Sequence, residues 1–539
     1  MTKTTKYTLT SIIALLSAIT ATPCLAQVEM ESLQPAAVYD PGTQEPQAGG
    51  LTAQLWQGIS AERATQVLQS ISATPSSTTK TLLRSVLLTG GIPPQSTDTI
   101  SHDLYTAARL QAILDLQEFS AFDYIVERAN LDASNPAFIK IFTQKSLLNA
   151  NTDKACEYSD MNTSERKAPY WAKLRAYCHV LRDELPAAEL TSDLLERSNH
   201  KDKVFFTLLG NLTGSITKPP KTKSLKTPLH IAMAPQAFGD EKFDTKSLPP
   251  SLAVSVAKDT KQEDQSRLNA LIRAAYILST NDFIAIIQSF TADSAPNLDS
   301  LPKTWAPADW GHVYNALRAS TDMEISATLS ATLLTQADKL GILNPMAEIL
   351  ASDIAIIPSH LKAKANPVLF AKLAIRKNDI GALGALHQNL DTDNALRPRI
   401  ALASDALGRG FMFAELGTDI ETRLGAKDAN TTDKARAIRD VYIANALGAT
   451  LSDTAIDALL EATKLKGHAA TAGQLLALQN AALNRQQAET LLRAADIIGK
   501  YNITGLRADT CAAILKALND VGLSNIAGQL AAQDFLTKS

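Results

Sequence analysis

The sequence predicts an all-α protein, an irregular α-solenoid of stacked, tetratricopeptide-like (TPR-like) helical hairpins in two arms. The chain of 539 residues contains 83 alanines, and alanine is the strongest helix former. Apolar residues recur at i, i+3, i+4 and i+7 along most of the chain, which is the period of an amphipathic helix. No segment of useful length alternates apolar and polar residues as a half-buried strand does.

Composition and charge exclude several classes of protein. The chain is 45% hydrophobic and 20% charged, with a formal net charge of -3. This balance excludes a collagen, a small disulfide scaffold and an acidic disordered protein, and it does not fit a nucleic-acid binder. The length allows about two to four domains or one elongated array of repeats.

The first residues, 1–26, are predicted to be a signal peptide. Lys3 and Lys6 form a positive start, an apolar run follows from Leu9 to Ile19, and small residues precede a cut after Ala26. The apolar run is too short to span a bilayer, and no later segment reaches about 18 uninterrupted apolar residues. We therefore expect an exported, periplasmic protein with no stable membrane insertion after signal cleavage.

Residues 27–50 follow the expected cleavage site and are predicted to be a disordered lead-in. They are rich in Gln, Pro, Gly and Glu and lack helical periodicity. A lipid anchor on Cys24 is the alternative to cleavage after Ala26, but Thr22 and Pro23 are not the small residues that a lipid-accepting cysteine requires before it.

An N-terminal helical array is predicted for residues 51–213. Apolar clusters with helical spacing begin at Leu51 and again at Leu82. Ser134-Asn135-Pro136 offers an N-cap and a first-turn proline for a further helix. Other helices are expected at about 102–118, 120–129, 137–150, 170–184, 187–197 and 202–212.

Residues 214–262 differ in composition from the segments on either side and are predicted to be a partly ordered connection. Pro-Pro pairs at 219 and 249 and lysines at 218, 221, 223 and 226 interrupt the helical pattern. Such a long connection would divide the array into its two arms.

A C-terminal, alanine-rich helical array is predicted for residues 263–539. Glycine followed by an apolar residue, as in Gly341-Ile342 and Gly522-Leu523, predicts a Schellman-type helix end, and Ser524 would then cap the next helix. Three turns resemble one another and should each join two helices: Arg182–Leu185, Thr280–Phe283 and Lys377–Ile380. The repeat period is irregular and does not match a strict array of about 34 residues per repeat.

The cysteines favour one disulfide. Cys156 and Cys178 flank a polar segment that is expected to connect two neighbouring helices. In an oxidising compartment a disulfide that closes a loop of about 20 residues would stabilise the fold by roughly 3 kcal/mol. Two buried thiols are the alternative. Cys511 lies on an apolar helix face and is predicted to be a core residue.

No catalytic, cofactor-binding or metal site is predicted. The eight histidines are scattered along the chain, so there is no local metal-ligand pair. Nucleotide-binding loops and nucleophile elbows are absent from the sequence. The catalytic glutamate and the Gly-Leu-Met-Gln motif of lytic transglycosylases do not occur at positions where they could form an active site. Carboxylates from distant segments could still meet as a catalytic pair. Trp171 belongs to a helical stripe and is predicted to be a core residue.

Three stretches carry a resemblance to a known group of proteins. They are Cys156–Leu195, Pro228–Ala234 leading into Leu248-Pro249-Pro250, and Ala517–Leu523. Together they resemble exported, alanine-rich helical-repeat proteins of Gram-negative, chiefly alphaproteobacterial, bacteria. The resemblance implies a helical-repeat fold but no activity and no site residues. Some members have an antifreeze-related label, yet the threonines here lack the regular repeat of an ice-binding helix.

These observations favour a non-enzymatic periplasmic scaffold or adaptor that binds another envelope protein or peptide through a helical array. The alternative is a peptidoglycan-associated enzyme or an activator of a cell-wall enzyme. In either case we expect no cofactor and no nucleic-acid partner.

Overall fold

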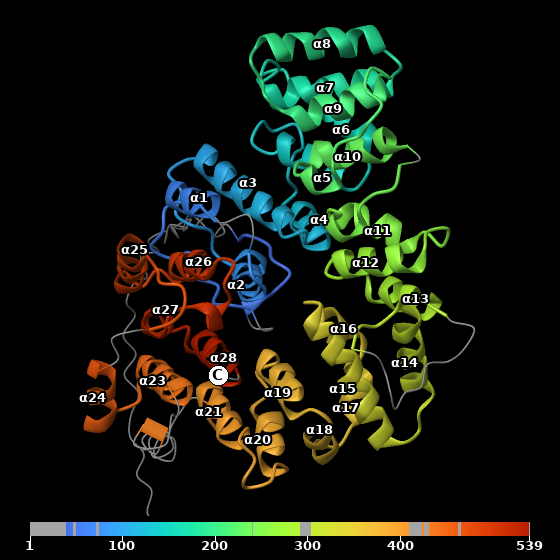
Figure 1. Ribbon diagram of the computed structural model, residues 1–539. Coiled ribbons are helices and arrows are strands. Elements are labelled where there is room, and N and C mark those ends of the chain that lie inside the picture. Colours follow the sequence, from blue (N-terminus) through green and yellow to red (C-terminus); the bar gives the residue numbers. More distant parts are fainter. Residues whose placement is uncertain are drawn as a thin grey trace, which may run out of the picture. The chain divides into compact units, whose positions relative to one another are not determined.

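The computed structural model describes residues 39–46, 50–71, 75–239, 241–291, 303–408, 423–424, 431–461 and 465–537. In this part of the chain the protein is all-α, with helices joined by short turns, four isolated β-bridges and no strand (Figure 1). The predicted fold class is therefore confirmed. The expected signal peptide, with Cys24 and the cleavage site at Ala26, lies outside the described residues.

Part of the expected lead-in is ordered. Asp40 forms a bridge with Gly91, and Gln44 forms a bridge with Thr89. The buried guanidinium of Arg109 donates to the Pro41 carbonyl oxygen at 3.0 Å. These contacts to residues far along the chain explain the order, because a sequence without helical periodicity can still be held by bonds to its backbone.

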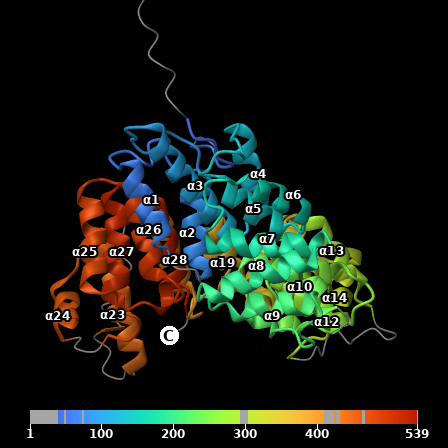
Figure 2. The same cartoon turned by 90° about the horizontal axis from the view of Figure 1, so that it is seen from above.

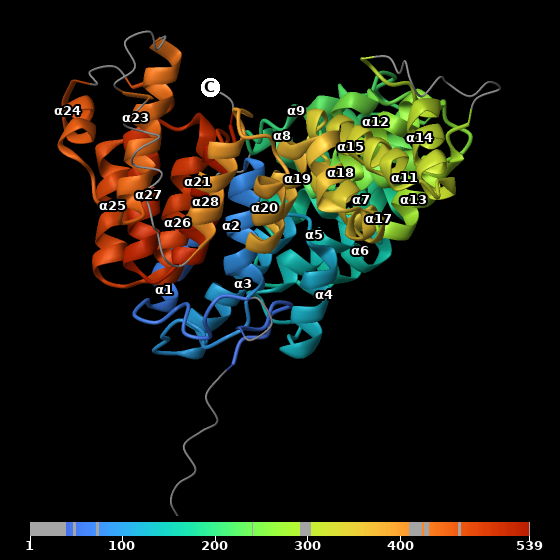
Figure 3. The same ribbon diagram turned by 90° about the horizontal axis from the view of Figure 1, so that it is seen from below.

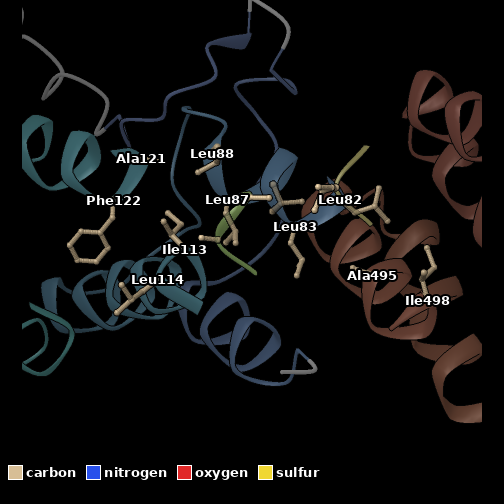
Figure 4. Packing of buried hydrophobic residues seen from close by; sticks show 14 of the residues in the cluster. Leu82, Leu83, Leu87, Leu88, Ile113, Leu114, Ala121, Phe122, Ala495 and Ile498 are labelled. Atoms are coloured by element: carbon tan, nitrogen blue, oxygen red, sulfur yellow. The ribbon is translucent and has the colours of Figure 1, made fainter. Parts of the chain in front are cut away.

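The first four helices form a core with a helix from the other end of the chain. They are α1 (Ala61–Gln69), α2 (Ser77–Leu88), α3 (Thr99–Asp115) and α4 (Phe119–Arg128). In Figure 4, Leu82 and Leu83 of α2 lie between Ile113 on one side and Ala495 on the other. α2 is thus buried on two faces, by α3 of its own region and by α26 (Gln487–Ile498).

The next region holds the disulfide. Its helices are α5 (Ile139–Leu148), α6 (Thr152–Met161), α7 (Pro169–Leu181), α8 (Leu185–Arg197) and α9 (Lys203–Leu212). Cys156 on α6 and Cys178 on α7 are bonded, with their Cα atoms 5.7 Å apart. Trp171 is buried, as predicted for a core residue. Asn135 accepts from the Ala137 N–H at 2.9 Å, but α5 begins only at Ile139, so the predicted start precedes the helix by one turn.

Residues 214–262, which we expected to be a partly ordered connection, contain two helices. α10 (Pro228–Phe238) packs on α5 and α9, and α11 (Pro250–Lys258) packs on α12. Pro228 and Pro250 are the first residues of these helices. Proline is well suited to a helix start because its missing N–H would be unpaired there anyway. Pro228 and Pro250 therefore mark helix starts, whereas the Pro-Pro pair at 219 lies outside any helix.

The central run of helices follows. It comprises α12 (Asp264–Ala274), α13 (Thr280–Ser289), α14 (Pro307–Ala319), α15 (Met323–Lys339), α16 (Leu343–Ile349), α17 (Ala351–Ile356), α18 (Ser359–Ala365), α19 (Pro367–Arg376), α20 (Ile380–Gln388) and α21 (Arg397–Leu407). The Ile342 N–H donates to the Ala337 carbonyl at 2.9 Å and Gly341 has φ 73°, which confirms the Schellman end of α15.

Two of the three similar turns join helices as predicted. Asp183, between α7 and α8, has φ 62°, and Asn378, between α19 and α20, has φ 54°. Each turn thus ends one helix and leads into the next. The third segment, Thr280–Phe283, instead lies in the first turn of α13, which is capped by Ser279.

The last helices are α23 (Thr431–Ala446), α24 (Asp453–Glu461), α25 (Ala472–Leu483), α26, α27 (Ala508–Asp520) and α28 (Ser524–Phe535). Gly522 has φ 83° and the Leu523 N–H donates to Leu518 at 2.9 Å, again as predicted. The prediction for Ser524 is wrong. It is the first helical residue, and its hydroxyl donates to Asn519 Oδ1 at 2.5 Å instead of capping α28.

Contacts between the first and last helices close the array on itself. Arg63 Nη2 pairs with Glu489 Oε1 at 2.5 Å, and Thr79 Oγ1 donates to the Gly499 carbonyl at 2.7 Å. Figures 1, 2 and 3 show α1 and α2 beside the C-terminal helices. Residues 39–539 form one compact unit, so contacts join what we expected to be two arms.

One close helix crossing depends on a glycine. A Cβ atom on Gly528 of α28 would lie 2.1 Å from the Ala406 carbonyl oxygen of α21, a backbone atom of the neighbouring helix. Gly528→Ala is expected to lower the free energy of unfolding by about 1–3 kcal/mol, because the two helices must separate. Urea denaturation followed by circular dichroism measures the change.

Gly384→Ala, in the middle of α20, is the matched control. A Cβ atom there meets nothing within 4 Å. Alanine should therefore stabilise the helix by about 0.5–1 kcal/mol. Equal effects of the two substitutions would contradict the steric explanation.

Candidate functional site

Closure of the array creates a pocket of about 300 Å³ between helices that lie far apart in the sequence. Its walls come from α2, α16, α19, α28 and the short 3-10 helix η5 (Ile503–Gly505), and α19 and α28 lie side by side in Figure 1. The lining residues are Ser77, Thr78, Thr81, Leu343, Asn344, Lys372, Leu373, Ile375, Arg376, Asn502, Ile503, Thr504, Gln529, Gln533, Leu536 and Thr537.

The lining of this central pocket is rich in amides and hydroxyls. Four amide side chains and five hydroxyl side chains are joined by two cations, Lys372 and Arg376, and the lining residues include no carboxylate. Amides both donate and accept hydrogen bonds, whereas Lys and Arg only donate. The pocket therefore offers more donors than acceptors and suits a ligand that carries carbonyl or carboxylate oxygens.

A smaller hollow of about 90 Å³ adjoins the central pocket and shares Asn344 and Arg376 with it. Arg84 of α2, Tyr276 after α12 and Glu348 of α16 are among its lining residues. The Tyr276 hydroxyl donates to the Gly341 carbonyl at 2.9 Å. Helices α2 and α16 thus contribute side chains to both hollows, and Tyr276 adds one from a further part of the array.

Three ion pairs orient the cations of this region. Arg376 Nη2 lies 3.2 Å from Glu348 Oε1, Lys372 Nζ lies 2.7 Å from Asp338 Oδ2, and Arg84 Nε lies 3.1 Å from Glu118 Oε1. The side chains of Arg376 and Glu348 are 38% and 68% exposed. Since such exposed pairs contribute only about 0–1 kcal/mol, a ligand carboxylate can compete for the guanidinium at little energetic cost.

Partial burial shifts the pKa of several side chains in this region, although water still reaches them. Burial lowers the pKa of Arg376 and raises the pKa of Tyr276, while 39% of Tyr276 remains exposed. Burial also raises the pKa of Glu118. Such a concave, partly desolvated wall strengthens the interaction between the cations and an anionic ligand, compared with a convex surface.

Asn502 holds two walls of the pocket together. It has φ 59°, a left-handed conformation that asparagine tolerates. Its Oδ1 accepts from Ser77 Oγ at 3.1 Å and from the Thr78 N–H at 3.4 Å. These bonds connect the η5 turn to the start of α2, so the C-terminal helices position the N-terminal wall.

The residues singled out from the sequence do not line the pocket. Cys156 and Cys178 are buried on α6 and α7, and Cys511 is a buried free thiol whose pKa is raised by burial. Among the described residues, no group of three His, Cys, Asp or Glu side chains is arranged to hold a metal ion.

Sequence reasoning missed the pocket residues, although one signal was present. Lys372 and Arg376 are four positions apart and so lie on one face of α19. Nothing local to α19 indicates that this face meets α2 and α28. Only the contacts of α28 with α19 and α21 bring Gln529 and Gln533 to the same place.

Comparison with protein-family models, with curated proteins and with solved structures found no match for this chain. The resemblance to exported alanine-rich helical proteins therefore stays a prediction. Within the described residues, none of the helices has the length and apolar character needed to cross a bilayer.

Proposed function

We propose that this protein is a non-enzymatic periplasmic scaffold or adaptor, which binds a carboxylate-bearing peptide segment of another envelope protein in the central pocket. The observation that supports this most is the pocket lining, which combines amides and hydroxyls with Lys372 and Arg376 and includes no carboxylate. A peptide presents both carbonyl oxygens and N–H groups, which amide side chains can pair with.

The two cations favour an anionic end or an acidic side chain on the ligand. The planar guanidinium of Arg376 can donate two parallel hydrogen bonds to a carboxylate, and such charge-assisted bonds are stronger than neutral ones. Leu373 and Leu536 supply apolar contact beside the polar groups. Capture of a chain terminus or acidic motif by such a site is a recurring mode of peptide recognition.

The proposed compartment depends on two further observations. The sequence pattern of residues 1–26 is that of a signal peptide. A disulfide between Cys156 and Cys178 is compatible with an oxidising compartment.

Site-specific photo-crosslinking in cells tests the proposal. A photoreactive p-benzoylphenylalanine at Gln533, in the pocket, should crosslink to a discrete envelope protein. The same group at Leu190 on α8, which is 62% exposed and outside the pocket, should not. Adducts of muropeptides alone would support the peptidoglycan-associated alternative, and equal adducts from both positions would contradict binding in the pocket.

Arg376→Ala should weaken binding of the crosslinked segment about 10-fold to 100-fold, because hydrogen bonds to charged groups contribute about 1.5–3 kcal/mol. Fluorescence anisotropy with a synthetic peptide of that segment measures the affinity. Arg318→Ala is the control, since Arg318 also forms an ion pair, with Asp353 at 2.6 Å, but does not line the pocket. A similar loss in both variants would contradict a specific role for Arg376.

A further inference from the structure

A second pocket, of about 490 Å³, lies between α1, α2, α3 and α5, and it shares no lining residue with the central pocket. Its size is within the range of about 300–1,000 Å³ that is typical of small-molecule sites. Most of its walls are aliphatic, with Leu68, Ile71, Leu83, Leu104, Leu116 and Ile141 among them. We call it the aliphatic pocket.

The small side chains of three alanines on α3 leave the space that forms the aliphatic pocket. Ala107, Ala108 and Ala112 line the aliphatic pocket from one helix, where longer side chains would fill it. Leu104, one turn before Ala108, is 49% exposed at the same pocket. The pocket is therefore open to solvent and accessible to a ligand.

Three charged side chains line this apolar pocket, Asp115, Lys140 and Glu165, and two of them are carboxylates. Asp115, the last residue of α3, lines the pocket, and its Oδ1 accepts from Gln111 Nε2 at 2.9 Å. Among the described residues, no Lys or Arg nitrogen lies within the 4.0 Å of an ion pair with Asp115. Asp115 is an exposed residue at the edge of the pocket, yet partial burial of its carboxyl raises its pKa, as expected beside apolar walls without a neighbouring cation.

The other charged residues of the pocket have partners of their own. The Lys140 ammonium lies over the Tyr170 ring, 5.3 Å from its centroid. Glu165 accepts from the Trp171 indole N–H at 3.1 Å. Neither contact is an ion pair, so two carboxylates and one ammonium give the lining a net negative charge, and a ligand cation would pair with Asp115.

We infer that the aliphatic pocket binds a cationic amphiphile, a molecule with an aliphatic chain that ends in an ammonium group. The chain lies against the leucine, isoleucine and alanine walls, and the ammonium group pairs with the Asp115 carboxylate. This site is independent of the central pocket and of the function proposed above. Each methylene group buried in the walls should raise affinity about fourfold.

Isothermal titration calorimetry with four probes, each below any micelle concentration it has, tests this inference. Decylamine should bind at least 10-fold more tightly than decanol and decanoate, and octylamine, which is two methylenes shorter, should bind about 16-fold more weakly than decylamine. Equal binding of decylamine and decanol, or no binding of any probe, would overturn it.

Three variants locate the site. Asp115→Asn should remove the preference for decylamine over decanol, whereas Asp153→Asn, at an exposed position on α6 outside the pocket, should leave it unchanged. Ala112→Phe should fill the pocket and abolish binding of both probes. Leu104→Lys, at a half-exposed position that tolerates a charge, should weaken decylamine binding by repulsion. Unchanged decylamine binding in Leu104→Lys and Asp115→Asn would show that the probe binds elsewhere.

Discussion

Replacing Asp534 with alanine should lower the free energy of unfolding by about 3–5 kcal/mol, because it leaves the buried Arg439 without its counter-ion and removes one of the two carboxylates that pair with Arg436. Asp534 on α28 is fully buried. Arg439 donates to both of its carboxylate oxygens at 2.5–3.1 Å, and Arg436 Nη2 lies 3.1 Å from Oδ1. Urea denaturation measures the loss.

The same network extends to other parts of the C-terminal helices. Arg439 also donates to the carbonyl oxygens of Ile503 and Leu506 in and beside η5, at 3.0 and 2.5 Å. Burial alone would lower the pKa of Arg439, but the hydrogen bonds and charge of Asp534 raise it overall. Since η5 contributes Ile503 and Thr504 to the central pocket, Asp534→Ala should disturb that wall as well.

Two controls separate the buried pair from a general effect of losing a carboxylate. Asp520→Ala on α27 removes the partner of Lys516, a pair whose side chains are 47% and 67% exposed, and should cost less than about 1 kcal/mol. The double substitution Arg439→Met with Asp534→Leu should recover part of the lost stability, because it removes both charges. A loss in Asp534→Ala no larger than in Asp520→Ala would contradict the role assigned to the network.

Replacing both Cys156 and Cys178 with serine should destabilise the α5–α10 region by about 3 kcal/mol. The disulfide joins positions 22 residues apart, and in the chain-entropy model a loop of this length restricts the unfolded state by about that amount. In the double serine variant, hydrogen exchange relative to the wild-type protein should accelerate more in α6 and α7 than in α26 and α27, because stability in an array is partly local.

Reduction of the protein provides the matched control. A reductant should lower the melting temperature of the wild-type protein and leave that of the double serine variant unchanged. If the reductant has the same effect on both proteins, or if exchange accelerates evenly along the chain, the disulfide does not act locally as proposed.

Local features of the fold could be predicted from the sequence where a single physical property explains why a residue type stands at a given position. The Schellman ends at Gly341 and Gly522 follow from the freedom of glycine at positive φ. The helix after Pro169 and the buried Trp171 follow from apolar spacing. The wrong prediction for Ser524 also came from a local rule. Serine is a good N-cap residue in isolation, but here it is the first residue of α28 and its hydroxyl donates to Asn519.

The central pocket could not be predicted because its walls belong to no local pattern. Thr78, Arg376 and Gln533 come from three separate helices, and each occupies an ordinary polar position in its own helix. Charge patterning indicates which face of α19 carries Lys372 and Arg376, but not what that face meets. In the same way, Asp115 became noteworthy only when the walls of the aliphatic pocket were known.

The sequence by itself determined the all-α class, the helices of the N-terminal array and several helix ends, and it favoured the pair of cysteines that bond, because helix propensity, apolar period and capping act within a few residues. The tertiary structure alone decided that Thr79 meets Gly499, 420 residues along the chain, and that a pocket forms beside this closure. The physical reason is that the path of a helical array depends on the angle between each hairpin and the next. These angles are set by side-chain packing, as at Gly528 against Ala406, and their small effects accumulate over many helices.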